Sequence, residues 1–308
     1  MTPNRCPGSN PGQQRSPTGG RPRRALSRLL SLLLFCVTCV GCSDSTPPSG
    51  EVDTLLWVED SAEYGAVTQS LYALARTQLD TALGDPSWTA ALEQTGDYSK
   101  LPPAVILDVD ETILSNAAYH VRLVKDGTKS KGKLRQAWFQ EARCPAIPGA
   151  LEFAKYAAGR GVTIFYVTNR PDAVRDGTRK NLEQLGFPFA KDREVLLMKA
   201  APSARNKAPR RAAVAKDFRV LLLVGDSLGD FISGGRSVDN GQRVALAEGH
   251  SEHWGSRWIP LPNPIEGDWK AAAFGYDKSL RTQERRERKI QALDARRTPA
   301  ALENSASP

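Results

Sequence analysis

The chain has few of the residues that form covalent cross-links or zinc sites. It contains 5 cysteines and 3 histidines in 308 residues, and all the cysteines except Cys144 lie in the first 42 residues. The rest of the chain therefore cannot form an internal disulfide. The histidines, which are His120, His250 and His253, have no partners at zinc-ligand spacing. These absences exclude a fold held by disulfides or structural zinc, so stability must come from a hydrophobic core.

The rest of the composition is that of a soluble globular protein, with 40% hydrophobic and 25% charged residues. The net charge of +8 comes largely from arginines near the two ends of the chain. Acidic residues alternate with the basic ones near the C-terminal end, at Glu284, Glu287 and Asp294. This mixture predicts a solvated helix, and we expect no nucleic-acid partner.

The first residues have the pattern of an export signal. A basic segment at 21–28 precedes an apolar stretch at 29–40, which is too short to span a bilayer comfortably. Gly41 and Cys42 follow at once, and the segment resembles a bacterial lipoprotein signal, in which Cys42 becomes the lipidated residue. Cys39 departs from that pattern, because an aliphatic residue is usual at this position. Simple secretion, an uncleaved anchor and twin-arginine export, suggested by Arg23 and Arg24, stay open.

Short apolar runs that end in polar residues recur beyond residue 100. They lie at 104–107, 162–167 and 220–224. Continuous apolar runs are typical of strands buried on both faces of a parallel sheet. The sequence predicts further strands at 243–247 and, shorter, at 194–198.

Helical patterns precede and separate these strands. They lie at 51–92, 149–161 and 172–186, and the last two end at a glycine, as helix C-termini often do. The alternation predicts an α/β fold with a doubly wound parallel sheet, Rossmann-like in its layers, beside a small helical N-terminal or inserted subdomain. Ligands bind such sheets at the carboxyl ends of the strands.

Two carboxylates two residues apart follow the first strand, in Asp108-Val109-Asp110-Glu111-Thr112. This spacing lets both side chains turn toward one point, so Asp108 can attack phosphorus while Asp110 protonates the leaving oxygen. Asp110 can then take a proton from water in a second step. A turn with an aspartate helix cap is the alternative interpretation of this motif.

A second acidic motif follows the strand at 220–224, with Asp226 and Asp230. Asp108, Asp226 and a main-chain carbonyl would form an oxygen site of the kind that Mg²⁺ binds. We therefore expect Mg²⁺ as the cofactor.

These motifs, in this order, resemble those of the haloacid dehalogenase superfamily. The chain is similar to the exported acid phosphatases of subfamily IIIB, in particular the lipoprotein acid phosphatase and 5′-nucleotidase group. The resemblance implies that Thr168 and Asn169 bind phosphate, that the Asp110 carbonyl is a metal ligand, and that Asp230 lies at or behind the metal. It also implies a phosphate-binding lysine, for which Lys207 fits better than Lys199 because an arginine follows it in Lys207-Ala-Pro-Arg210.

Two positions bear on the substrate. Trp138 lies near the place where related nucleotidases have an aromatic residue that stacks on a base, although a core position fits Trp138 nearly as well. Related members have a tyrosine where this chain has Glu266, which puts a nucleotide preference in doubt. Tyr276 and Trp254 are candidate replacements for that tyrosine.

We therefore expect an exported phosphomonoesterase, an outer-membrane lipoprotein or a periplasmic protein, whose partners are small phosphomonoesters and, through Cys42, a membrane. Its expected parts are a leader with signal at 1–41, a linker and helical region at 42–100, the phosphatase domain at 101–278 and a charged helical tail at 279–308. The alternative is a surface lipoprotein that binds a ligand without catalysis. Whether the chain forms a homo-oligomer is left open.

Overall fold

The computed structural model describes residues 49–130 and 132–295. The predicted leader, signal and Cys42 lie outside the described residues. None of the described helices has the length and apolar character that a bilayer crossing requires.

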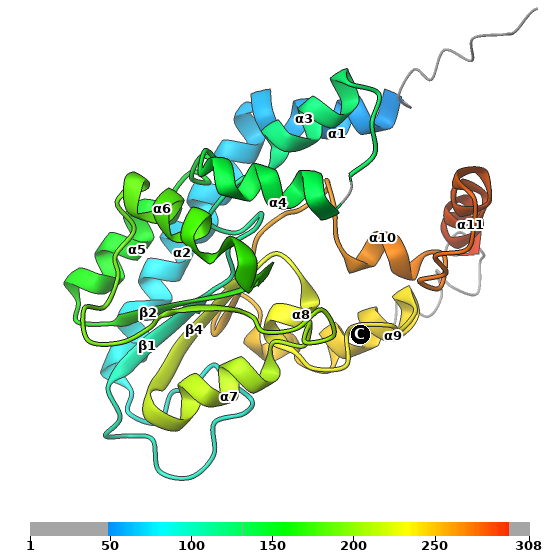
Figure 1. Ribbon diagram of the computed structural model, residues 1–308. Helices are drawn as coiled ribbons and strands as arrows, with labels where there is room; N and C mark the ends of the chain where they lie inside the picture. The colour runs from blue at the N-terminus through cyan, green and yellow to red at the C-terminus, as the bar shows by residue number, and fades with distance from the viewer. Residues whose placement is uncertain (1–48, 131, 296–308) are drawn as a thin grey trace, which may run out of the picture. The chain divides into compact units, whose positions relative to one another are not determined.

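A five-stranded parallel sheet forms the centre of the fold (Figure 1). Its order is β3-β2-β1-β4-β5, so the chain winds outward from β1 in one direction and then returns to wind in the other. The strands are β1 Pro103–Leu107, β2 Thr163–Pro171, β3 Leu196–Lys199, β4 Arg219–Gly225 and β5 Trp258–Pro260. All seven residues of β4 are buried, as its continuous apolar run predicted. The doubly wound parallel sheet is thus confirmed, and its direction reverses between β1 and β4, where such sheets bind ligands.

Helices cover both faces of the sheet. Figure 1 shows α2 and α5 on one face and α7 on the opposite face. The N-terminal and inserted helices are α1 Ser49–Asp60, α2 Ala62–Gly84, α3 Ala117–Lys125 and α4 Gly132–Glu141. The helices that alternate with the strands are α5 Ala150–Gly159, η1 Asp172–Val174, α6 Arg175–Leu185, α7 Ala208–Asp217, α8 Leu228–Phe231, α9 Asn240–Glu248 and η2 Ser251–His253. The last two are α10 Asp268–Ala272 and α11 Thr282–Ala295.

The long helix α2 attaches the N-terminal region to the sheet. Ser61 caps its first turn by accepting a hydrogen bond from the Tyr64 amide, 3.1 Å away. Tyr72, Ala75 and Leu79, spaced three and four residues apart, are buried in the main core. The Tyr72 hydroxyl donates to the Thr112 carbonyl at 2.7 Å, which ties α2 to the turn after β1.

A smaller apolar cluster joins α1, α3 and the segment before α10. It contains Leu55, Val58, Tyr64, Ala117 and Ile265. This cluster packs α1 against the inserted helix α3.

The strand expected at 243–247 is wrong, because these residues belong to α9. The Asp239 side chain accepts a hydrogen bond from the Gln242 amide at 2.9 Å, and the Gln242 side chain accepts one from the Asp239 amide at 3.2 Å. This reciprocal cap starts a helix that the short apolar run alone could not distinguish from a strand. The fifth strand, β5, has only three residues and was not predicted.

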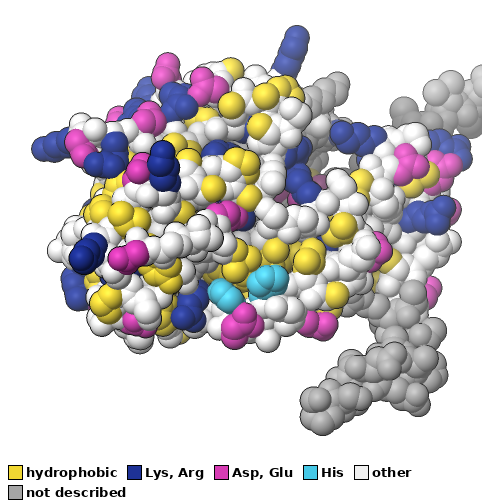
Figure 2. Space-filling model, turned by 90° about the horizontal axis from the view of Figure 1, so that it is seen from below, with side chains coloured by type: hydrophobic (Ala, Val, Ile, Leu, Met, Phe, Trp, Pro, Cys, Tyr) yellow, Lys and Arg dark blue, Asp and Glu magenta, His cyan; other side chains and the backbone are white. Residues whose placement is uncertain are grey.

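Charges of both signs are mixed on the face of the molecule shown in Figure 2. Lys and Arg side chains alternate there with Asp and Glu and with apolar side chains. Among the residues drawn in colour, that face therefore has no continuous basic stripe.

Candidate active site

The site is built on the turn that follows β1. The Asp108 amide donates to the Val224 carbonyl at 2.9 Å, which fixes the end of β1 against β4. Glu111 adopts a positive φ of 55°, and the chain turns sharply enough there for Thr112 to face back toward Asp108. The Thr112 hydroxyl lies 3.1 Å from Asp108 Oδ2. Asp108 is thereby held at the switch point of the sheet.

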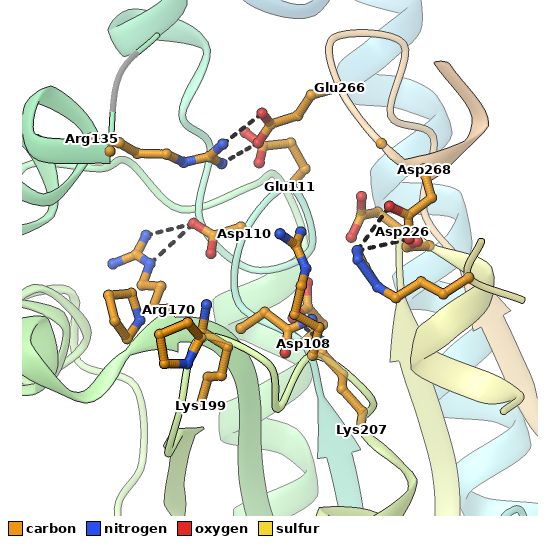
Figure 3. Close-up of a pocket in the computed structure, with 18 of the residues that line it drawn as sticks. Asp108, Asp110, Glu111, Arg135, Arg170, Lys199, Lys207, Asp226, Glu266 and Asp268 are labelled. Carbon is orange, nitrogen blue, oxygen red and sulfur yellow. Dashed lines mark hydrogen bonds and ion pairs between the residues drawn. The ribbon is translucent and has the colours of Figure 1, made fainter. Parts of the chain in front are cut away.

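Lys207 lies directly against Asp108. Its Nζ contacts Asp108 Oδ1 and lies 2.6 Å from Asp230 Oδ1. All three side chains are at least nine-tenths buried. Burial and the neighbouring carboxylates raise the pKa of Asp108 to about 6, and the Lys207 ammonium limits that rise. Of the two lysines considered from the sequence, Lys207 is the one in contact with Asp108, whereas Lys199 lines the same cavity from the end of β3 (Figure 3).

Asp108, Asp226 and Asp230 form an acidic cluster whose carboxylate oxygens lie within 4.8 Å of one another. Burial and the charges of Asp230 and Asp108 raise the pKa of Asp226 well above its ordinary value. Asn263 donates to Asp226 Oδ2 at 2.7 Å and holds that carboxylate in place. A set of oxygen donors whose charges repel one another fits a hard divalent cation.

The loop after β4 holds Asp230 firmly. Asp230 Oδ2 accepts from the Ser227 amide at 2.9 Å. Arg211, fully buried, donates to the Asp230 carbonyl at 2.9 Å and pairs with Glu93. The backbone of the second motif is thus fixed from α7.

Asp110 is bound by a residue that sequence reasoning did not single out. Arg170, at the end of β2, donates from Nε and Nη2 to Asp110 Oδ1 at 3.0 and 2.9 Å (Figure 3). Asn116 donates to the same oxygen at 2.8 Å. Burial opposes ionisation of Asp110, but the charges of Arg170 and Arg135 outweigh it and lower the pKa below its ordinary value. The polar segment after the second strand was the only sequence signal for Arg170.

The two predicted phosphate-binding residues of β2 have different surroundings. Thr168 is fully buried, and its hydroxyl accepts from the Arg170 amide at 3.1 Å. Asn169 lines the cavity, and its side-chain oxygen accepts from Arg210 at 2.7 Å. The structure thus brings Asn169 to the cavity surface and places Thr168 just behind it.

Trp138 lies in the core and not on the cavity wall. It is 3% exposed, its indole donates to the Asn116 side chain at 2.9 Å, and its ring stacks on Tyr119. Of the two interpretations of Trp138, this placement favours the packing role. The neighbouring Phe139 does line the cavity.

Glu266 is held in an ion pair over the cavity. Arg135 of α4 donates to Glu266 Oε2 at 2.7 Å and also contacts Oε1, while His120 lies 3.6 Å from Oε2. Burial opposes ionisation of Glu266, but His120 and Arg135 lower its pKa to about 2. Nearby, burial and the charges of Glu266 and Asp110 raise the pKa of Glu111 to about 8.

The cavity has a volume of about 890 Å³ and reaches from the acidic cluster to α4 and α10. It is large enough for a whole small substrate and not only for a phosphate group. The insertion between the first motif and Cys144 is short, and its helix α4 contributes one wall of this cavity.

A parallel sheet whose switch point carries paired carboxylates, a buried lysine and a metal-type acidic cluster defines an α/β enzyme of phosphoryl chemistry. The chain belongs to the haloacid dehalogenase superfamily, subfamily IIIB, the acid phosphatases, because the sequence profile of that family matches residues 49–269. It is accordingly a phosphomonoesterase. Phosphatases of this superfamily use a divalent metal, and the acidic cluster could bind one.

Solved structures agree with this assignment. The chain is similar to the class C acid phosphatase from Bacillus anthracis, with 29% identity, a TM-score of 0.68, and coverage of 78% of this chain and 95% of that one. A second structure of that phosphatase, with tungstate bound, matches with a TM-score of 0.69 at the same identity and coverage.

Proposed function

We propose that the chain hydrolyses small phosphomonoesters with Mg²⁺ through an aspartyl phosphate on Asp108, outside the cytoplasm. The observation that carries this proposal is the placement of Asp108, which contacts Lys207 on one side and adjoins Asp226 on the other. Tungstate is a tetrahedral oxyanion like phosphate, and its presence in the related Bacillus anthracis structure supports an anion site in this family.

In the first step, a carboxylate oxygen of Asp108 attacks phosphorus and the ester P–O bond breaks. Lys207 offsets negative charge on the transferring group, and Asp110 gives its proton to the leaving alcohol oxygen. Asp110 Oδ2 is the oxygen suited to this transfer, because Asn116 and Arg170 both bind Oδ1. In the second step, Asp110 takes a proton from a water molecule whose oxygen attacks phosphorus. The P–O bond to Asp108 breaks, which restores the Asp108 carboxylate and releases inorganic phosphate.

Asp108, Asp226 and Asp230 would hold the Mg²⁺, with the Asp110 carbonyl as a further ligand. The ion would screen the charge of the carboxylates against the dianionic substrate and polarise the transferring group. Asn263, which the sequence did not predict, orients Asp226 for this role.

Replacement of Asp108 by Asn tests the mechanism. We expect turnover of p-nitrophenyl phosphate with Mg²⁺ to fall below detection, while the unfolding temperature stays near that of the wild type. Asp239→Asn, which keeps a good helix cap at a residue that does not line the cavity, is the matched control. Activity near the wild-type level in the Asp108 variant, or undiminished activity in EDTA, would contradict the proposal.

Neither Trp138 nor position 266 offers an aromatic face to the cavity. Trp138 is buried in the core, and the Glu266 carboxylate forms an ion pair with Arg135. We therefore propose that small polar phosphomonoesters are the substrates.

The export part of the proposal rests on the sequence before residue 49. We propose that the signal is cleaved before Cys42 and that Cys42 is lipidated. Cys42→Ser should move the protein from the membrane fraction to the soluble fraction of the cell envelope. Membrane association that survives this change would argue for an uncleaved anchor instead.

A further inference from the structure

The cavity continues beyond the acidic cluster to a wall rich in cations. Lys199 comes from the end of β3, Arg205 from the loop before α7, and Arg236 from the segment after α8. Figure 3 shows Lys199 pointing up from β3 into the cavity. A smaller hollow of about 160 Å³ adjoins the cavity and shares Arg205 and Arg236 with it, so there is space around these side chains.

Among the residues that the structure describes, three carboxylates line the cavity outside the turn after β1 and the acidic cluster, and each is already paired with an arginine. Arg175 pairs with Asp172 at 2.6 Å, and Arg236 pairs with Asp268 at 2.8 Å. The third, Glu266, is paired with Arg135. None of these acids is left to balance the remaining cations.

Lys199 and Arg205 form no ion pair with any carboxylate of residues 49–130 and 132–295. Burial and the charges of Arg205, Arg210 and Arg236 lower the pKa of Lys199. The cations therefore repel one another. An anion placed among them would remove that repulsion and accept hydrogen bonds from several donors at once.

This cation cluster is separate from the group that faces the scissile phosphate. Lys207 contacts Asp108 and Asp230, whereas Lys199 and Arg205 contact neither carboxylate. A cavity of about 890 Å³ has room for both a scissile phosphate and a second charged group.

We propose that Lys199 and Arg205, with Arg236, bind a second anionic group of the substrate, a phosphate or a carboxylate. The preferred substrates are then phosphomonoesters with a second anion a few bonds from the scissile phosphate, such as bisphosphates and phosphorylated hydroxy acids. This inference rests on the proposed phosphatase function for the location of the first phosphate.

The test uses ligands that cannot be hydrolysed, so it does not depend on turnover. Calorimetry in about 0.15 M salt, where exposed charges are screened, compares propane-1,3-bisphosphonate, 3-phosphonopropanoate and propylphosphonate, with Mg²⁺ present. We expect the wild type to bind the bisphosphonate at least about tenfold more tightly than propylphosphonate. The carboxylate ligand shows whether one or both kinds of second anion are accepted.

Lys199→Gln/Arg205→Gln should reduce the ratio of the two affinities to about one. Lys180→Gln, which removes an exposed cation from α6, should leave the ratio unchanged. Equal affinities in the wild type, or an unchanged ratio in the double variant, would overturn the inference. Selective binding without any phosphatase activity would instead keep the anion site and refute the proposed function.

Discussion

Arg170 binds one oxygen of Asp110 and leaves the other facing the cavity. Nε and Nη2 of Arg170 lie 3.0 and 2.9 Å from Oδ1, and among the described residues Oδ2 accepts no hydrogen bond. A catalytic proton on Asp110 would therefore be carried by Oδ2. The strength of the Arg170 pair then sets the pH at which that proton is lost.

Replacement of Arg170 by Gln should extend activity to higher pH. Arg170 lowers the pKa of Asp110, so its removal raises that pKa and keeps the acid protonated further up the pH scale. We expect the alkaline limb of kcat/KM to move up by about one pH unit or more. Glycerol 1-phosphate is a suitable substrate, because its poor leaving group depends on the acid. Arg193→Gln on the surface serves as the control, and a limb that does not move would show that Asp110 is not the acid.

Removal of one carboxylate from the acidic cluster should change the unfolding temperature in opposite directions with and without metal. Asp226 is buried beside Asp108 and Asp230, so Asp226→Asn relieves repulsion and should raise the unfolding temperature in EDTA. The variant should also lose the stabilisation that Mg²⁺ gives the wild type, which is about 2.7 kcal/mol at a concentration 100 times Kd. Thermal unfolding across a Mg²⁺ series measures both effects. A wild-type response to Mg²⁺ in Asp226→Asn would place the ion elsewhere.

The strand ends of the site could be predicted because their signals are local. Asp108 and Asp226 directly follow buried apolar runs, and parallel strands bring such positions together whatever the intervening sequence. The partners of these residues could not be predicted in this way. Arg170 is 60 residues from Asp110, and Asn263 is 37 residues from Asp226. Their pairing depends on how the strands and loops pack.

Trp138 and α9 are two further features that the local sequence alone could not decide. An aromatic residue next to the site can face the cavity or the core, and only the hydrogen bond to Asn116 and the stack on Tyr119 decide for the core. The apolar run at 243–247 is compatible with a strand or a helix, and the cap at Asp239 makes it part of a helix.

Replacement of Trp138 by Phe should affect stability more than substrate choice. The change removes the indole donor and leaves the Asn116 oxygen without that bond, at a cost of about 1–3 kcal/mol in the free energy of unfolding. Because Trp138 does not line the cavity, the ratio of kcat/KM for AMP to that for glycerol 1-phosphate should stay constant. Denaturant unfolding and the two rate measurements check this. A fall of tenfold or more in the ratio would restore the stacking role.

Replacement of both Arg135 and Glu266 tests whether their ion pair limits nucleotide binding. Glu266→Tyr alone would leave Arg135 without its carboxylate, so we pair it with Arg135→Gln. If the ion pair occupies the space that a nucleotide base would take, the ratio of kcat/KM for AMP to that for glycerol 1-phosphate should rise several-fold in the double variant. Glu266→Gln/Arg135→Gln is the control without an added ring. Equal ratios in the two double variants would show that Glu266 does not limit nucleotide binding.

The Arg135–Glu266 pair should make the free energy of unfolding fall as the pH is lowered. The folded pKa of Glu266 is lowered to about 2, below an unfolded value of about 4.3, so its contribution is complete above pH 4.3 and is lost as pH falls toward 2. Glu266→Gln should be less stable than the wild type at pH 7, by about 1–3 kcal/mol, because it leaves Arg135 unpaired. The difference should shrink between pH 4.3 and 2. Urea unfolding at pH 7, 4 and 2.5 measures it, and a difference that is constant over this range would mean that the Glu266 charge does not stabilise the fold.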